Sequence, residues 1–405
     1  MRSGAALALA FVTILAGCSS APPPVTTPAP APEKPREPAP EPAPKPTPPP
    51  IPTPPPVRTR VPVRLAFVGD INLGTTTLPD GVPPDSGRAF LSSVRPFLNG
   101  DLVVGNLEGV LADTGTSEKC VDRTPRRPAK RSRSRPVPPD TTRSRPGCYA
   151  FLTPVHLAPR LREAGFTHLG LANNHAHDYG LDGRASTERT LTSLGLKWYG
   201  PLGHIAIDTV RRGDSVTVVG LVGFATYPHS YDLLDIPRSV TVVDSVERLT
   251  DIVVVTFHGG TEGAAATRVG PGPEFLGKEP RGDLRAWAHA VVDAGADLVV
   301  GHGPHVLRGM EWYRDRLIAY SLGNFATYRG FSLAGPLGIT GVLRLTLASD
   351  GRVETGRLIP MRQEPRSGPL PDGAANAVDL VNRLSTDDFG PDAVLFEPDG
   401  TLTHP

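Results

Sequence analysis

The sequence predicts a layered α/β domain with a mixed sheet, and three observations lead to this expectation. Apolar runs recur at residues 65–68, 102–104, 252–255 and 298–300, and runs of this length are typical of strands buried on both faces. Segments with helical character separate several of these runs. Finally, of 405 residues, about 340 follow a proline-rich N-terminal part, which is enough for one large domain or two smaller ones.

The elements follow in a mostly alternating order. We expect strands at residues 63–68, 102–104, 167–171, 197–199, 205–208, 216–222, 252–257 and 298–300. We expect helices at residues 87–97, 156–164, 183–194, 284–294 and 374–384. Gly195 and Gly295 follow two of these helices, as glycine commonly does at a helix C-terminus. Residues 317–321 and 341–347 are interpreted as an antiparallel pair, because apolar and polar residues mix in the second segment.

The N-terminus is typical of an exported, lipid-anchored protein. Residues 1–17 contain Arg2 and an apolar stretch that ends in Leu-Ala-Gly, and Cys18 follows directly. This order resembles the bacterial lipobox, so we expect a signal peptide and a lipid on Cys18, which would attach the protein to the outer or periplasmic face of a membrane. An ordinary signal peptide followed by a chance cysteine is the alternative. Residues 18–62 are rich in proline, which favours an extended, disordered linker.

The domain proper is expected at residues 63–362, with residues 363–405 as a peripheral extension. A basic insertion at residues 121–147 interrupts it and is interpreted as a solvated loop, or as a contact for an anionic polymer or lipid headgroups. Cys120 and Cys148 flank the insertion, and export favours a disulfide between them over two free thiols. The net charge of +1 gives no argument for nucleic-acid binding.

Six short segments with metal-binding side chains lie at or near predicted strand ends. They are Gly-Asp-Ile-Asn at 69–72, Gly-Asn-Leu-Glu at 105–108, Asn-Asn-His at 173–175, His-Gly-Gly-Thr-Glu at 258–262, Gly-His-Gly-Pro-His at 301–305 and Ser-Leu-Gly-Asn at 321–324. In layered α/β proteins, ligands bind outside the carboxyl ends of strands. The pattern therefore predicts a metal centre assembled from many strands, with a water-filled polar crevice as the alternative.

The candidate ligands combine carboxylates, amides and imidazoles: Asp70, Asn72, Asn106, Glu108, Asn174, His258, His302 and His305. Two divalent ions a few ångströms apart repel each other, so a bridging carboxylate and neutral imidazoles are needed to hold them. This donor mixture suits two ions of Mn, Fe or Zn. His175 adjoins Asn174 and is the candidate proton donor, and Asp178 is placed to orient its imidazole.

These motifs resemble those of the CapA family, bacterial capsule-synthesis proteins of the poly-γ-glutamate machinery, which is itself similar to the calcineurin-like metallophosphoesterases. The similar segments are residues 67–74, 105–109, 172–180, 301–307 and 319–325, in the family's order. The resemblance implies a four-layered αββα sandwich around a metal crevice. It also supports the roles given above to the candidate metal ligands and to His175 as proton donor. Three positions depart from the pattern: Asn72 replaces a histidine of related phosphoesterases, Gly259 a tryptophan, and Gly303 a histidine.

Two functions remain open. The first is an envelope-anchored, metal-dependent hydrolase of phosphoesterase type that serves capsule or exopolymer synthesis. The second is a non-catalytic lipoprotein subunit that binds an anionic polymer for a membrane synthase. Scavenging of phosphate esters is less favoured, because the aromatic residues that could stack on a base are scattered.

Overall fold

The structure is a computed structural model that describes residues 59–120 and 148–403. Cys18, the proline-rich linker and the basic insertion lie outside these residues. Among the residues it describes, no helix is both long and apolar enough to cross a membrane.

Eight strands form the first sheet, in the order β19-β18-β17-β1-β2-β5-β6, with β16 also paired to β1. Their bounds are β1 Val63–Asn72, β2 Leu102–Leu107, β5 His168–Gly170, β6 Lys197–Tyr199, β16 Asn324–Thr327, β17 Ile339–Leu347, β18 Val353–Glu364 and β19 Gly368–Pro371. Strands β2 and β16 run parallel to β1, whereas β17 is antiparallel to it. The sheet is therefore mixed, as the sequence predicts.

Seven strands form the second sheet, in the order β14-β15-β13-β10-β8-β7, with β9 beside β8. Their bounds are β7 Ala206–Arg212, β8 Ser215–Ala225, β9 Tyr231–Asp232, β10 Ile252–His258, β13 Leu298–His302, β14 Met310–Tyr313 and β15 Arg316–Ala319. Three short pairs complete the strands: β3 Val110–Leu111 with β4 Leu152–Thr153, β11 Glu274–Leu276 with β12 Glu279–Gly282, and β20 Leu395–Phe396 with β21 Leu402–Thr403.

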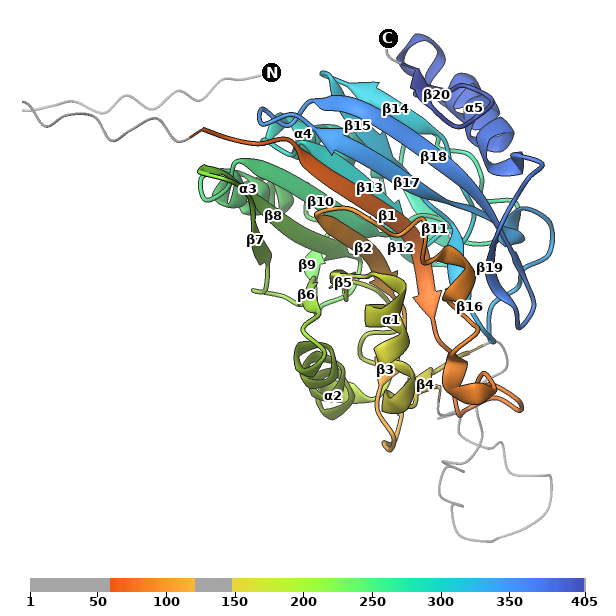
Figure 1. Ribbon diagram of the computed structural model, residues 1–405. Helices are drawn as coiled ribbons and strands as arrows, with labels where there is room; N and C mark the ends of the chain where they lie inside the picture. The colour runs from red at the N-terminus through yellow and green to blue at the C-terminus, as the bar shows by residue number, and fades with distance from the viewer. Residues whose placement is uncertain (1–58, 121–147, 404–405) are drawn as a thin grey trace, which may run out of the picture. The chain divides into compact units, whose positions relative to one another are not determined.

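The described residues form the helices α1 Pro159–Ala164, α2 Gly180–Ser193, α3 Ile236–Glu247, α4 Leu284–Asp293 and α5 Asn376–Phe389. Helices α1 to α4 lie on the outer faces of the two sheets, whereas α5 packs against β18 of the first sheet and β14 of the second (Figure 1). Residues of α1 and α2 share a buried cluster with the first sheet, and residues of α3 and α4 share another with the second sheet. A third cluster lies between the sheets. The expected four-layered αββα sandwich is confirmed.

Alternation along the central strands explains why both faces of each sheet are buried. Leu65 and Phe67 of β1 point into the cluster between the sheets, whereas Ala66 and Val68 point toward α1 and α2. This two-residue period is the geometry of any strand, and a continuous apolar run satisfies both faces at once.

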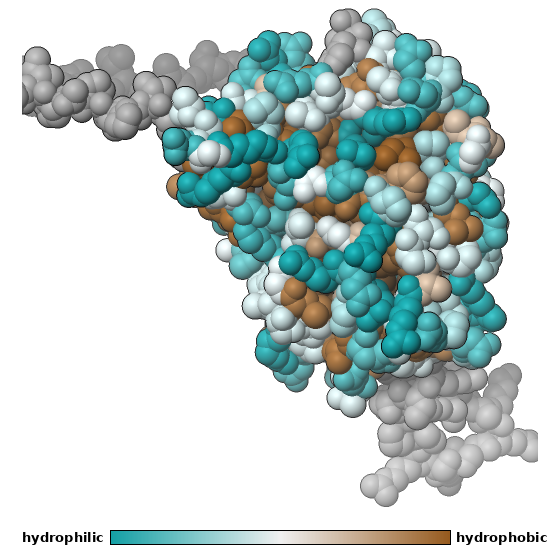
Figure 2. All heavy atoms as spheres, viewed as in Figure 1, coloured by the Kyte–Doolittle hydropathy of each residue, from teal (hydrophilic) through white to brown (hydrophobic). Residues whose placement is uncertain are grey.

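Figure 2 shows hydrophilic residues over most of the visible face, with apolar groups between them where β1 and β17 approach the surface.

Three expectations about the elements are wrong. The helix at 87–97 is instead two short 3-10 turns, Asp85–Gly87 and Ser92–Val94. The Ser92 hydroxyl donates to the Ala89 carbonyl at 2.8 Å, and a serine that bonds to the backbone in this way competes with a continuous helix.

The pair at 317–321 and 341–347 is also wrong, because β15 lies in the second sheet and β17 in the first. The partner of β15 is the unpredicted strand β14, which pairs with it in an antiparallel register. The C-terminal part is not peripheral either. Val378 and Val381 of α5, Phe396 of β20 and Leu402 of β21 are buried in the cluster between the sheets.

Helix α3 was not predicted. Its sequence contains four valines, and valine favours strands. The Asp235 carboxylate caps its first turn by accepting a hydrogen bond from the Arg238 backbone N–H at 3.0 Å. Its buried valines pack against the second sheet, so tertiary packing overrides local preference here.

Candidate metal centre

The predicted ligands come from the carboxyl ends of strands in both sheets. Asp70 of β1 lies beside Asn106 of β2 in the first sheet. His258 of β10 lies beside His302 of β13 in the second. Because each parallel pair ends at one edge and the two sheets face each other, these four side chains converge.

The distances define a compact centre. Asp70, Glu108 and His258 are buried, and one ligand atom from each lies within 4.8 Å of the others. His305 Nδ1 is 2.9 Å from Asp70 Oδ2, and His302 Nδ1 is 3.5 Å from Asp70 Oδ1. The structure thus brings five of the predicted ligands together.

Glu262 and Arg281 join this centre, although the predicted ligand set omits both. His305 Nε2 is 3.9 Å from Glu108 Oε1 and 3.9 Å from Glu262 Oε2. Glu262 Oε1 is in turn 2.9 Å from Arg281 Nη2. Glu262 belongs to one of the motifs, so the sequence held a signal for it. Arg281 lies in the β11–β12 hairpin, where no motif points to a role in the site.

Backbone geometry brings the loops close together. A side chain at Gly69 would collide with the Gly323 carbonyl oxygen, which accepts a hydrogen bond from the Asp70 backbone N–H at 2.9 Å. His305 has a left-handed backbone, with φ of 62°. Non-glycine residues seldom adopt this conformation unless other contacts hold them, and the contact with Asp70 is such a contact.

Several buried polar atoms of the centre have no hydrogen-bond partner among the described residues. They are both carboxylate oxygens of Glu108, His258 Nε2, His302 Nδ1 and Asn174 Oδ1. A buried polar atom without a partner costs roughly 1–3 kcal/mol, and more if it is charged. Divalent cations would satisfy carboxylate, imidazole and amide donors together, so these residues fit the metal group that the sequence predicts.

The charges of the centre perturb one another. Burial raises the pKa of Glu108 well above its usual value, and the neighbouring Asp70 charge adds to this. Burial also opposes ionisation of Asp70, but the neighbouring His302 and His305 imidazoles hold its pKa below the usual value. Burial would lower the pKa of His305, but the Glu108 and Asp70 carboxylates raise it to about 9. Without a cation, protons therefore balance the charge.

Two predicted ligands have other roles in the structure. Asn72 donates from Nδ2 to the Glu108 carbonyl oxygen at 2.8 Å, and its Oδ1 accepts from the Gly74 N–H at 3.0 Å. Asn106 donates from Nδ2 to Asp70 Oδ1 at 2.9 Å, and its Oδ1 accepts from Asn173 Nδ2 at 2.9 Å. Both side chains therefore tie the loops of the site together, and because an amide oxygen can accept twice, their assignment as ligands stays a prediction.

His175 and Asp178 form the predicted pair. His175 Nδ1 is 2.7 Å from Asp178 Oδ2, which also accepts a hydrogen bond from the Phe151 N–H at 2.7 Å. Because an ionised carboxylate only accepts, the proton lies on Nδ1. No described residue hydrogen-bonds to Nε2, so this nitrogen is the one left for a substrate.

Burial lowers the pKa of His175 to about 4, because it outweighs the favourable Asp178 carboxylate, and the Lys119 charge lowers it further. The imidazole is thus neutral at pH 7 in the absence of substrate. An anionic group beside Nε2 would raise this pKa again, which a proton donor requires.

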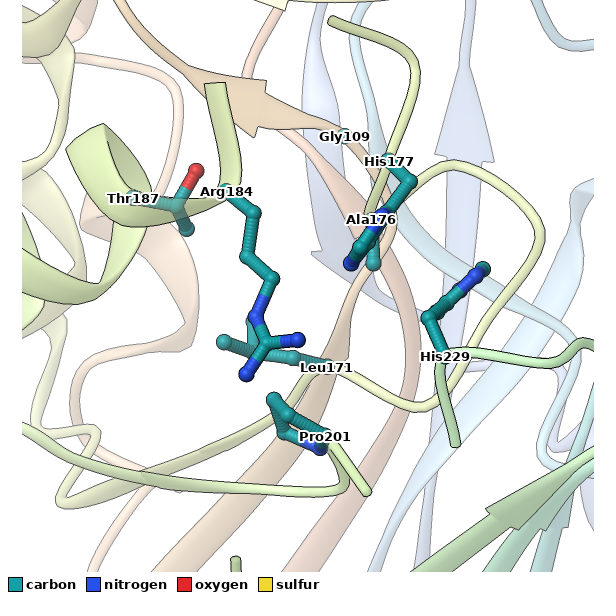
Figure 3. Close-up of a pocket in the computed structure, with 8 residues that line it drawn as sticks. All are labelled: Gly109, Leu171, Ala176, His177, Arg184, Thr187, Pro201 and His229. Atoms are coloured by element: carbon teal, nitrogen blue, oxygen red, sulfur yellow. The ribbon is translucent and has the colours of Figure 1, made fainter. Parts of the chain in front are cut away.

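A small hollow lies beside the 173–177 loop (Figure 3). The His177 and His229 rings stack at 4.1 Å between centroids, and Arg184 of α2 reaches across the hollow toward Pro201. His229 Nε2 is 2.9 Å from the Asn173 carbonyl oxygen. His229 therefore supports the loop that carries the candidate ligand Asn174.

Cys120 and Cys148 are joined by a disulfide, with 5.5 Å between their Cα atoms. The described residues just before and just after the insertion therefore lie side by side. Cys18 lies outside the described part of the chain, so its lipidation stays a prediction.

Comparison with known proteins agrees with the motifs. The family model described as "Bacterial capsule synthesis protein PGA_cap" matches residues 136–329. This range contains the motifs at Asn174, His258 and His302 but begins after Asp70 and Glu108.

Two relatives are similar over comparable lengths. The capsule biosynthesis protein CapA of Bacillus anthracis is 30% identical over 201 residues, which are 44% of this chain and 46% of that protein. The PGA biosynthesis protein CapA of Bacillus subtilis is 32% identical over 186 residues, 42% of this chain and 45% of that protein. The chain thus spans slightly less than half the length of each relative.

Among solved structures, the 5'-nucleotidase precursor from Thermus thermophilus aligns with a TM-score of 0.38 at 13% sequence identity, covering 80% of this chain and 59% of that one. The ordered motifs, the family model over residues 136–329 and the two Bacillus relatives agree that this chain is similar to the CapA family of bacterial capsule-synthesis proteins over slightly less than half of its length.

Proposed function

We propose that this protein is a metal-dependent hydrolase of phosphoesterase type that serves capsule or poly-γ-glutamate-type exopolymer synthesis. One observation carries the proposal: Asp70, Glu108 and His258 come from both sheets with ligand atoms within 4.8 Å of one another, and both Glu108 oxygens and His258 Nε2 have no hydrogen-bond partner among the described residues. Ordered water in a polar crevice would satisfy the same atoms, so bound metal is the measurement that separates the two interpretations.

The ligand assignment follows from the geometry. Asp70, Glu108 and His258 form the core of the site, and His302 and His305 flank Asp70. When bound, divalent cations in such a site act as Lewis acids on the scissile group and acidify water. Burial favours the neutral form of Glu108, and the neighbouring carboxylates favour the protonated form of His305, so a bound cation would compete with protons at both residues.

The chain's own catalytic contribution rests on His175. Asp178 fixes its tautomer and leaves Nε2 available to exchange a proton with the substrate. A phosphoester supplies the anionic charge that would raise the imidazole pKa. An amide bond in a polycarboxylate is the other substrate class compatible with this arrangement, and similarity to capsule-synthesis proteins does not decide between the two classes.

Metal content and turnover test this proposal together. Purified chain is analysed by mass spectrometry for bound metals, and we expect about two equivalents of Mn, Fe or Zn. Asp70→Asn and His258→Ala should each lose most of this metal, because they remove core ligands. His289→Ala is the matched control, since His289 contacts Glu311 at 3.0 Å on another surface.

Turnover is then measured on an aryl phosphodiester, an aryl phosphomonoester and poly-γ-glutamate. Hydrolysis that depends on metal supports the enzyme. Stoichiometric metal without turnover of any of these would favour the non-catalytic polymer-binding subunit. A chain that binds no metal after loading with each cation would contradict the proposal outright.

We also propose that a lipid on Cys18 holds the protein on the outer face of a bacterial membrane. Detergent phase partitioning of cell extracts measures this. The parent chain is expected in the detergent phase and Cys18→Ala in the aqueous phase or retained as precursor. Identical partitioning of both, with a processed N-terminus beyond residue 18, would refute the anchor.

A further inference from the structure

Lys119 reaches the candidate acid from outside the predicted site. Its Nζ lies 2.5 Å from Asp178 Oδ1, 2.7 Å from the Asn174 carbonyl oxygen and 3.2 Å from His175 Nδ1. The ammonium group therefore touches the ligand loop, the candidate acid and the carboxylate that orients it.

The contact completes the surroundings of Asp178. The Asp178 side chain has no exposed surface, whereas Lys119 keeps 32% of its own. One carboxylate oxygen accepts from Lys119, and the other accepts from His175 and from the Phe151 backbone. A buried carboxylate with donors on both oxygens has one preferred orientation, and that orientation fixes the imidazole.

The disulfide explains how Lys119 is held. It joins residues 28 positions apart in the sequence, one of which is the immediate neighbour of Lys119. Cys148 Sγ also lies 3.9 Å from the Lys119 carbonyl oxygen. Lys119 and Phe151 therefore approach Asp178 from the two sides of the insertion, and the disulfide keeps those sides together.

We propose that Lys119 is a positioning residue for His175, and that the Cys120–Cys148 disulfide keeps its ammonium group at the His175–Asp178 pair. This inference rests on the proposed hydrolase function and deepens it. Lys119 sets the direction of the imidazole and, through the Asn174 carbonyl, the path of the ligand loop.

The protein supplies a matched control. Lys197 Nζ lies 2.7 Å from Asp208 Oδ1, and Asp208 Oδ2 lies 3.3 Å from His168 Nε2. This second Lys–Asp–His group is at β5, β6 and β7, away from the strand ends that carry the metal centre. Replacing Lys197 therefore removes the same kind of ion pair without touching the site.

The experiment compares Lys119→Met, Lys119→Arg and Lys197→Met in the full chain. Lys119→Met should lower kcat about 10- to 100-fold with little change in KM. The reason is that the displaced His175 imidazole is needed in the transition state and not for substrate binding. Lys119→Arg should recover part of this loss, and Lys197→Met should match the parent. Metal content should stay at the parent level in all three.

A second readout needs no substrate. Nitrogen-15 NMR of the imidazole rings reports whether His175 keeps its proton on Nδ1 and how fast that proton exchanges with water. We expect faster exchange in Lys119→Met, but parent-like exchange in Lys197→Met. If the parent protein hydrolyses none of the substrates but the difference in His175 proton exchange is still seen, the positioning role of Lys119 stands. Only the hydrolase proposal then fails. Unchanged exchange and unchanged kcat in Lys119→Met would overturn the inference.

The disulfide is tested with Cys120→Ser/Cys148→Ser. This double variant should lose kcat in the same direction as Lys119→Met while metal content is retained. Lost stability is a separate effect, so the comparison is made well below the melting temperature of the variant. Parent-like kcat and parent-like His175 exchange in the double variant would remove the disulfide from the inference.

Discussion

The two Lys–Asp–His groups have the same composition but differ in whether the histidine has a ring nitrogen available for a ligand. His175 bonds to Asp178 through Nδ1, and no described residue bonds to its Nε2. His168 has a protein group beside each nitrogen: Nδ1 is 2.8 Å from the Thr167 hydroxyl, and Nε2 lies within ion-pair distance of Asp208 Oδ2, at 3.3 Å. A histidine with a protein group beside each nitrogen supports structure, whereas one whose Nε2 faces no described partner can act on a ligand.

Burial separates the two groups further. The Asp208 side chain is 25% exposed and Lys197 48%, whereas Asp178 is fully buried. Burial opposes ionisation of Asp208, but hydrogen bonds from His168 and Lys197 hold its pKa below the usual value. Solvent screens much of this effect, so the outer group contributes little to stability. Residue types alone therefore do not identify a catalytic group.

Replacing the two aspartates tests the difference between the two groups most directly. Asp178→Asn should lower kcat by about 100-fold or more, because the amide no longer holds the same imidazole tautomer and leaves Lys119 without its charge partner. Asp208→Asn should leave kcat unchanged and cost at most about 1 kcal/mol in unfolding free energy. Steady-state kinetics and denaturant titration measure both. Equal losses of kcat in the two variants would show that the difference between the groups has no catalytic meaning.

A smaller effect concerns acid stability. The pKa of His175 is about 4 in the folded protein, against about 6.5 in an unfolded chain. The unfolded chain therefore binds more protons between these values, so unfolding free energy falls as pH drops from 6.5 to 4. One such group accounts for a loss on the order of 2–3 kcal/mol.

His175→Gln should flatten this dependence. Denaturant titrations at several pH values, with a chelator present so that metal release does not contribute, measure the slope in both proteins. His177, whose pKa is also lowered to about 4 by burial and the His229 charge, adds a slope common to both. Identical slopes in parent and variant would contradict the assignment.

The central strands were predictable because they are fully buried. An apolar run that satisfies both faces of a sheet, as at β1, β10 and β13, leaves a signal that local sequence can carry. Short edge elements such as β14 have no such signal, and α3 resembles a strand. The location of β15 and β17 in different sheets depends on long-range pairing, which no local pattern encodes.

The residues of the candidate site likewise differ in how far the sequence predicts their positions. Asp70, Glu108, His258, His302 and His305 each end or follow a buried strand, so their positions follow from the fold class. Glu262 lies within a recognised motif, yet its closeness to His305 depends on loop geometry.

Lys119 and Arg281 reach the site from a loop and a hairpin, where residue type does not indicate which way the side chain points. Asn72 and Asn106 carry the right chemistry, and the sequence does not reveal that their amide groups also tie the loops of the site together.

The origin of the ligands in two sheets has a consequence for how the protein matures. Asp70 and Glu108 belong to the early part of the chain, and His258 and His302 to the late part, so neither sheet alone forms the centre. Contacts between such distant segments require long loops of chain to close, which slows their formation. A nascent or partly folded chain therefore has no complete site. Under the proposed metal assignment, a cation would be acquired in the compartment in which the two sheets dock.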